Sequence, residues 1–97
     1  MLVGISTFAT EYSTDITKLA KRAEGLGFDS LWVGEHPVLP VDISSAWPDD
    51  PTNTVPIIDS HICDPFVALA RASASTSTIK LGTGVCLVPE HNPLLLA

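Results

Sequence analysis

Basic side chains are scarce in this sequence. Its 97 residues include five Lys and Arg residues against eleven Asp and Glu residues, which gives a formal net charge of −6. No basic cluster offsets this charge, and an acidic chain repels a phosphate backbone, so we expect no nucleic-acid partner. Long apolar runs are also missing: no stretch approaches the roughly 20 apolar residues that cross a bilayer, so we expect no membrane partner. The hydrophobic content of 45% indicates a globular domain.

Cysteines and the common catalytic motifs are scarce as well. Cys63 and Cys86 do not form a C-x-x-C pair, and residues 1–15 lack the basic segment and apolar run of a signal peptide. We therefore expect a cytoplasmic protein with two reduced, buried thiols. The sequence contains no P-loop and no nucleophile elbow. Its His, Asp and Glu residues show no recognised ligand spacing such as H-x-H or H-E-x-x-H, so no metal site is predicted.

Apolar runs and helical periodicity alternate along the chain. Short apolar runs predict strands over residues 2–8, 30–34 and 79–88. Helices are predicted over residues 15–26 and 64–75, and a third helix begins at residue 93. The first of these helices carries one apolar stripe, formed by Ile16, Leu19, Ala20, Ala23 and Leu26. Asp64-Pro65 and Asn92-Pro93 each set a capping side chain before a proline, which is typical of a helix start.

Residues 37–63 differ from the rest of the chain. Five of the eight prolines lie in this segment, together with many Ser, Asp, Asn and Thr residues. Loops of this length inside a compact domain are usually functional, so we interpret this one as a lid or substrate wall.

The order βαβαβ(α) predicts an α/β domain with parallel strands. It fits either a doubly wound sheet or a (β/α)8 barrel of the TIM type. A dinucleotide-binding sheet would carry G-x-G-x-x-G after its first strand. The turn after Phe8 contains no glycine, which argues against that fold.

Ligands of parallel α/β folds bind at the carboxyl ends of the strands, which here are residues 6–8, 34–36 and 85–91. Glu35 and His36 are the leading candidates, because a histidine there can donate a hydrogen bond or transfer a proton. The alternative is a loop histidine beside a surface carboxylate. His91 precedes a helix start and could approach a phosphate or a substrate, or it could be a solvated loop residue.

Gly82 and Gly84 are two residues apart and fall on one face of the third strand. They would leave room for a flat ligand such as an isoalloxazine ring, or they mark a tight corner of the sheet.

Four segments in order resemble the luciferase-like monooxygenases. They are residues 19–36 (LAKRAEGLGFDSLWVGEH), 64–70 (DPFVALA), 79–85 (IKLGTGV) and 92–97 (NPLLLA). The Glu-His-Pro segment and the acidic loop after it are most similar to the branch that uses the deazaflavin coenzyme F-420. The resemblance covers nearly the whole chain, and residues 1–97 would form the N-terminal part of the barrel domain.

The resemblance implies a (β/α)8 barrel roughly three times this length, of which the chain supplies the first three βα units. It also implies F-420 or FMN at the mouth of the barrel. His36 and Glu35 would be catalytic. Cofactor contacts would come from four residues: Thr7, Gly84, Val85 and His91. Relatives often carry a non-proline cis peptide at the position of Gly84-Val85.

The expected activity of the complete barrel is hydride transfer between the cofactor and a small organic substrate, or monooxygenation of that substrate. The expected assembly is a homo-oligomer. An alternative is a non-catalytic barrel fragment that self-associates through its exposed strand edge. A third, weaker alternative is a metal-dependent barrel hydrolase.

Overall fold

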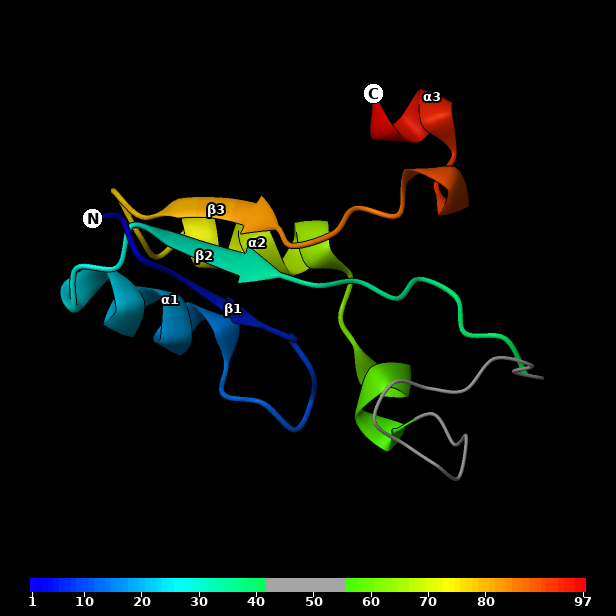
Figure 1. Ribbon diagram of the computed structural model, residues 1–97, viewed down its shortest axis with the longest axis horizontal. Coiled ribbons are helices and arrows are strands. Elements are labelled where there is room, and N and C mark those ends of the chain that lie inside the picture. Colours follow the sequence, from blue (N-terminus) through cyan, green and yellow to red (C-terminus); the bar gives the residue numbers. More distant parts are fainter. Residues whose placement is uncertain (42–55) are drawn as a thin grey trace.

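The computed structural model describes residues 1–41 and 56–97. Its helices, strands and 3-10 helices (η) follow in the order β1 (Gly4–Thr7), α1 (Ile16–Gly25), β2 (Ser30–Val33), η1 (Ile57–His61), α2 (Pro65–Ser73), β3 (Lys80–Thr83), η2 (Val88–Glu90) and α3 (Pro93–Leu96). The strands form one parallel sheet in the order β1-β2-β3. Figure 1 shows α3 lying beyond the carboxyl ends of the strands. The predicted alternation of parallel strands and helices is confirmed.

Helix α1 begins where the sequence predicts it. The Asp15 carboxylate accepts hydrogen bonds from the backbone N–H groups of Thr17 (2.9 Å) and Lys18 (3.3 Å), which caps the first turn. The helix ends at Gly25, and Gly27 follows with a φ of 83°, a conformation that glycine adopts without steric cost. Leu26 is largely exposed, so its predicted place in the apolar stripe is wrong.

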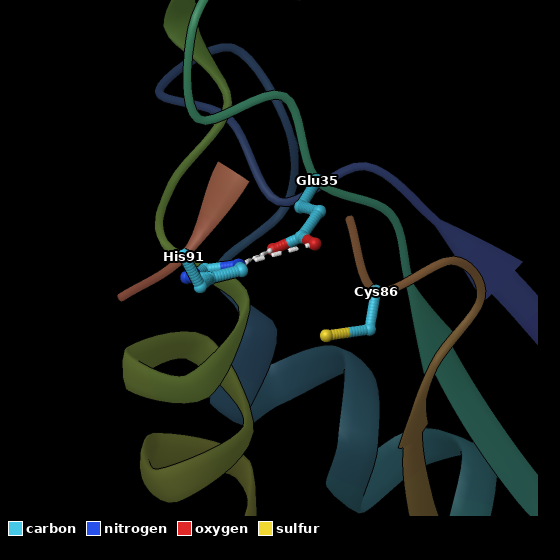
Figure 2. A group of neighbouring side chains, drawn as sticks. All are labelled: Glu35, Cys86 and His91. Carbon is cyan, nitrogen blue, oxygen red and sulfur yellow. Dashed lines mark hydrogen bonds and ion pairs between the residues drawn. The ribbon is translucent and has the colours of Figure 1, made fainter. Parts of the chain in front are cut away.

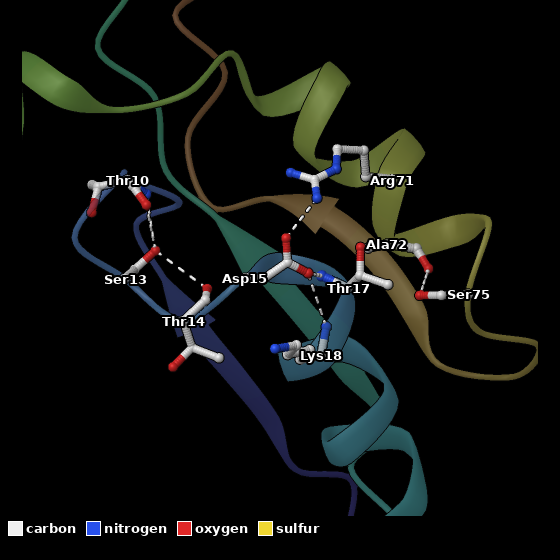
Figure 3. A network of polar contacts seen from close by, with 9 residues as sticks. All are labelled: Thr10, Ser13, Thr14, Asp15, Thr17, Lys18, Arg71, Ala72 and Ser75. Carbon is white, nitrogen blue, oxygen red and sulfur yellow. Dashed lines mark hydrogen bonds and ion pairs between the residues drawn. The ribbon is translucent and has the colours of Figure 1, made fainter.

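Helix α2 is tied to the start of α1 by one side chain. Asp64 caps α2 through the N–H of Val67 (2.9 Å), as predicted. The guanidinium of Arg71 donates to the second carboxylate oxygen of Asp15, so this residue caps α1 and holds α2 at the same time (Figure 3). The hydrogen bond from Arg71 lowers the pKa of Asp15.

One core lies between the sheet and both helices. Leu31 and Val33 of β2 are its largest fully buried side chains. The helices contribute mainly alanine: Ala20, Ala23, Ala68 and Ala72 are buried against them. Small side chains let the helices approach the sheet closely. Both α1 and α2 cover the same face of β2 and leave the opposite face of the sheet open.

Trp32 occupies the open face of the sheet. Its indole N–H donates to the Ser30 hydroxyl (3.0 Å). The ring lies over Gly82, where an added Cβ would come within 2.7 Å of it. The room that Gly82 creates is therefore filled by tryptophan, and the interpretation of Gly82 as space for a flat ligand is wrong.

The third strand is shorter than the predicted range of 79–88. The neighbouring strand β2 ends at Val33, so pairing stops at Thr83 and one further bond joins the Gly84 N–H to the Val33 carbonyl (2.7 Å). The first strand is also shorter than residues 2–8: it spans Gly4–Thr7, and residues 1–3 before it are exposed. The length of each strand depends on the neighbouring strand with which it pairs, and an apolar run in the sequence does not show where that pairing ends.

The predicted loop of residues 37–63 contains regular structure in its described part. Helix η1 lies within it, and Ile62 forms an antiparallel bridge with Thr10. Residues 42–55 lie outside the described residues. In the part of the chain that the structure describes, no helix is long and apolar enough to cross a membrane.

Glu24 of α1 caps the segment that enters β3. Its carboxylate accepts hydrogen bonds from the backbone N–H groups of Ser77, Thr78 and Ile79, at 2.7 to 3.2 Å. These bonds lower the pKa of Glu24 from 4.5 to about 2, the largest effect coming from Ile79. The negatively charged form of Glu24 therefore stabilises the segment that enters β3.

We predict that Glu24→Gln lowers the midpoint of thermal unfolding at pH 7. A lowered pKa in the folded state stabilises the fold above the unfolded pKa and is lost as the pH falls toward about 2. The difference between Glu24→Gln and wild type should therefore shrink between pH 4.5 and pH 2. Glu90→Gln, at an exposed carboxylate, is the control and should leave the midpoint unchanged. Equal midpoints for Glu24→Gln and wild type at pH 7 would contradict the assignment.

Candidate functional site

The carboxyl ends of the three strands enclose a pocket of about 350 Å³, which we call the strand-end pocket. Its lining combines small residues with apolar side chains and one titratable pair: Ser6, Phe8, Gly34, Glu35, His36, Gly84, Val85 and Leu87. These are the strand ends to which the sequence pointed. The parallel register brings them together, because it aligns Thr7 with Val33 and Val33 with Thr83.

A second pocket, of about 240 Å³, adjoins the first and is called here the loop pocket. Its lining comes from the end of β2, the start of α2 and the turn before α3: Glu35, His36, Pro37, Ile62, Cys63, Asp64, Pro65 and His91. Glu35 and His36 line both pockets. These two residues therefore form the boundary between the strand-end pocket and the loop pocket.

Glu35 is buried, with only 1% of its side chain exposed. The His91 imidazole lies against it, with Nε2 at 3.1 Å from one carboxylate oxygen and 3.3 Å from the other. The Leu87 backbone N–H also donates to the carboxylate. The alternative of a surface carboxylate is therefore wrong for Glu35. His91 is mostly buried as well, with 19% of its side chain exposed, so the alternative of a solvated loop histidine is also wrong.

Cys86 completes this cluster. Figure 2 shows the Cys86 side chain below the Glu35 carboxylate, with its sulfur directed toward the space beside the His91 imidazole. Partial burial, and then the charge of Glu35, raise the pKa of the Cys86 thiol. Both cysteines are free thiols, as predicted, but Cys63 is exposed, so its predicted burial is wrong. Sequence reasoning assigned Cys86 no function, because its partners are 51 and 5 positions away and form no motif.

His36 faces a different neighbour from Glu35. Its imidazole stacks on the ring of Phe8, with the ring centres 6.5 Å apart and the planes inclined by 26°. Both residues line the two pockets, but Glu35 is buried, whereas the side chain of His36 is only partly buried. His36 is thus the more accessible of the two to a ligand.

Gly84 and Val85 line the strand-end pocket, as the sequence suggested. An added Cβ on Gly84 would meet only the backbone of Val33, at 3.6 Å, so the space beside this glycine is open. The described residues contain no cis peptide bond, so the bond between Gly84 and Val85 is trans.

Thr7 is not among the residues that line either pocket. Its hydroxyl donates to the Phe8 carbonyl (3.4 Å). Its neighbours Ser6 and Phe8 line the strand-end pocket instead. The alternation of side chains along β1 was the signal that could have selected them.

A family model described as luciferase-like monooxygenase matches residues 3–97. The chain belongs to the luciferase-like monooxygenase family, whose members are oxidoreductases that generally use flavin-type cofactors. An uncharacterized protein of Mycobacterium tuberculosis strain H37Rv is 36% identical over 99 residues, which cover 100% of this chain and 35% of that protein. The chain thus spans about a third of the length of this relative.

Two relatives have named activities. The 4-hydroxyprotoasukamycin monooxygenase of Streptomyces nodosus subsp. asukaensis is 32% identical over 80 residues, which cover 82% of this chain and 17% of that protein. The limonene 1,2-monooxygenase of Rhodococcus erythropolis is 31% identical over 80 residues, which cover 82% of this chain and 16% of that protein. No solved structure matches the chain.

We predict that His91→Ala destabilises the fold by about 3 kcal/mol, because it leaves the Glu35 carboxylate buried with no imidazole beside it. The matched control is His61→Ala. His61 pairs with Glu11, and both of these side chains are more than one third exposed, so its loss should cost less than about 1 kcal/mol. Urea unfolding of both variants measures the two values. Equal losses would contradict the argument from burial.

Proposed function

We propose that this chain forms the cofactor-binding end of a flavin-type oxidoreductase that either exchanges hydride with a small organic substrate or oxygenates it. The cofactor is F-420 or FMN. The proposal rests on the strand-end pocket. This pocket lies at the carboxyl ends of the parallel strands, where ligands of such folds bind, and the chain belongs to a family of oxidoreductases.

We further propose that β1, β2 and β3 are the first three strands of a (β/α)8 barrel. Two features support this over a doubly wound sheet. The strands are neighbours in sequence order, and both crossover helices pack against one face of β2 through a shared core. In a barrel all helices lie outside and the opposite face points inward. The open face with Trp32 would then be the barrel interior.

The residues of the strand-end pocket suit a flat, largely apolar ring. Phe8, Val85 and Leu87 supply apolar walls, while Gly84 leaves open space beside the backbone. A bound flavin or deazaflavin would supply the hydride or oxygen chemistry. The chain's contribution is to bind and orient the ring and to exclude water from one side of it.

We assign distinct roles to the two titratable residues of the pocket. His36 is the proposed catalytic residue: its imidazole donates a hydrogen bond or holds a proton at the reacting ring or substrate. Its stacking on Phe8 limits the orientations of the imidazole. Glu35, held by His91 and the Leu87 N–H, acts as a positioning residue that fixes the turn on which His36 lies.

Titration of the purified full-length protein with F-420 and, separately, with FMN tests the proposed function. We expect one of the two to bind, with quenching of its fluorescence. Val85→Trp should weaken this binding by at least about tenfold, because the larger side chain fills the pocket. Val67→Trp is the matched control: Val67 is 55% exposed, close to the 57% of Val85, but lies on α2. Binding of neither cofactor would refute the proposal.

His36→Asn tests the catalytic role separately. We expect kcat to fall by about a hundredfold or more, because proton transfer by a positioned side chain contributes about 10² to 10⁴, while the cofactor dissociation constant changes little. The control is His61→Asn, because His61 lies in η1, pairs with Glu11 and lines neither pocket. An unchanged kcat with a weakened cofactor affinity would instead make His36 a binding residue.

A further inference from the structure

We propose that Glu35, Cys86 and His91 bind one Zn²⁺ ion. Each residue offers one ligand atom, and the carboxylate oxygen, the thiol sulfur and the imidazole nitrogen all lie within 4.8 Å of one another. Figure 2 shows the three side chains converging from separate segments of the chain. This site goes beyond the proposed oxidoreductase function and does not depend on it.

The distances suit a tetrahedral ion. With Zn–O and Zn–N bonds of about 2.0–2.1 Å, two such ligands lie roughly 3.3 Å apart, and a sulfur at about 2.3 Å lies roughly 3.6 Å from either of them. The His91 Nε2 atom is 3.1 and 3.3 Å from the two oxygens of Glu35. Closing the cluster therefore requires side-chain movements of about 1 Å and no rearrangement of the fold.

The backbone fixes the three donors from different directions. Glu35 follows the central strand β2. Cys86 and His91 flank η2, whose turn is closed by bonds from the Glu90 N–H to the Leu87 carbonyl (2.8 Å) and from the His91 N–H to the Val88 carbonyl (3.2 Å). This turn brings two donors that are five residues apart close to the Glu35 carboxylate.

Neighbouring groups already orient two of the donors, as the supports of metal ligands commonly do. The Leu87 N–H donates to the Glu35 carboxylate. The ring of Phe66 contacts the His91 imidazole edge-on, with the ring centres 5.9 Å apart. An ion held here would also neutralise a carboxylate that is almost wholly buried, where an uncompensated charge is costly.

The donor types select the ion. A thiolate, an imidazole and a carboxylate together favour Zn²⁺, whereas Mg²⁺ and Ca²⁺ prefer sites made of oxygen alone. Binding requires the thiolate form of Cys86, so its proton passes to the solvent. Three protein ligands leave a fourth position, and the loop pocket, which Glu35 and His91 line, gives water or a small ligand access to it.

The test is a calorimetric titration of chelator-treated full-length protein with Zn²⁺ alone, followed by Co²⁺ as a spectroscopic probe. We expect one Zn²⁺ per chain and a thiolate-to-cobalt charge-transfer absorption. Cys86→Ser should weaken Zn²⁺ binding by more than about a hundredfold and abolish this absorption, since even residues behind a ligand change affinity by about 10- to 100-fold. His91→Asn should weaken binding to a similar extent.

Two matched variants separate loss of the site from loss of any thiol or histidine. Cys63→Ser removes an exposed thiol that lines the loop pocket, and His61→Asn removes a histidine that pairs with another carboxylate. Both should bind Zn²⁺ as wild type does. Far-UV circular dichroism verifies that each variant is folded. Cys86→Ser leaves the Glu35–His91 pair in place, so this variant tests the site even if His91→Asn unfolds. Absence of stoichiometric binding, or equal affinity of wild type and Cys86→Ser, overturns the proposal, whatever the outcome of the F-420 and FMN titrations.

Discussion

Burial of the central strand is the constraint on which the rest of this structure depends. Leu31 and Val33 of β2 have no exposed surface, and alanines of α1 and α2 close over them. Both neighbouring strands pair with β2 in parallel register. Because all three strands run in one direction, their carboxyl ends meet at one edge, and the pockets form there. Sparse polar links then hold the helices in place, notably Asp15 to Arg71 between α1 and α2.

The same constraint explains the buried carboxylate. Glu35 follows Val33 by two residues and, like it, is buried. A carboxylate in that position needs partners, and the turn around η2 supplies the Leu87 N–H and the His91 imidazole. His36 is left at the pockets beside Phe8. One dipeptide thereby supplies a pocket-lining histidine and a carboxylate within a cluster of potential metal donors.

Local signals predicted the elements well and their ends less well. Asp64 and Asn92 both cap the helices that they were expected to cap, because capping needs only the next three residues of the chain. The third strand ended five residues early, because its length depends on β2. Of the predicted site residues, Glu35, His36, Gly84, Val85 and His91 all line a pocket, whereas Thr7 does not. Their catalytic and cofactor-binding roles stay predictions, and Cys86, which lies beside Glu35 and His91, was not singled out from the sequence.

The sequence by itself predicted the α/β alternation, the parallel strands and membership of the luciferase-like monooxygenase family. Each of these predictions rests on short stretches of sequence: apolar periodicity, capping residues and family motifs in order. Packing decided the rest. It filled the space at Gly82 with Trp32, set Glu24 against the entry to β3, and joined Glu35 to Cys86 and His91. Such contacts link positions about 50 residues apart. The distances between these side chains depend on how the helices pack against the sheet, and a local sequence pattern does not contain that information.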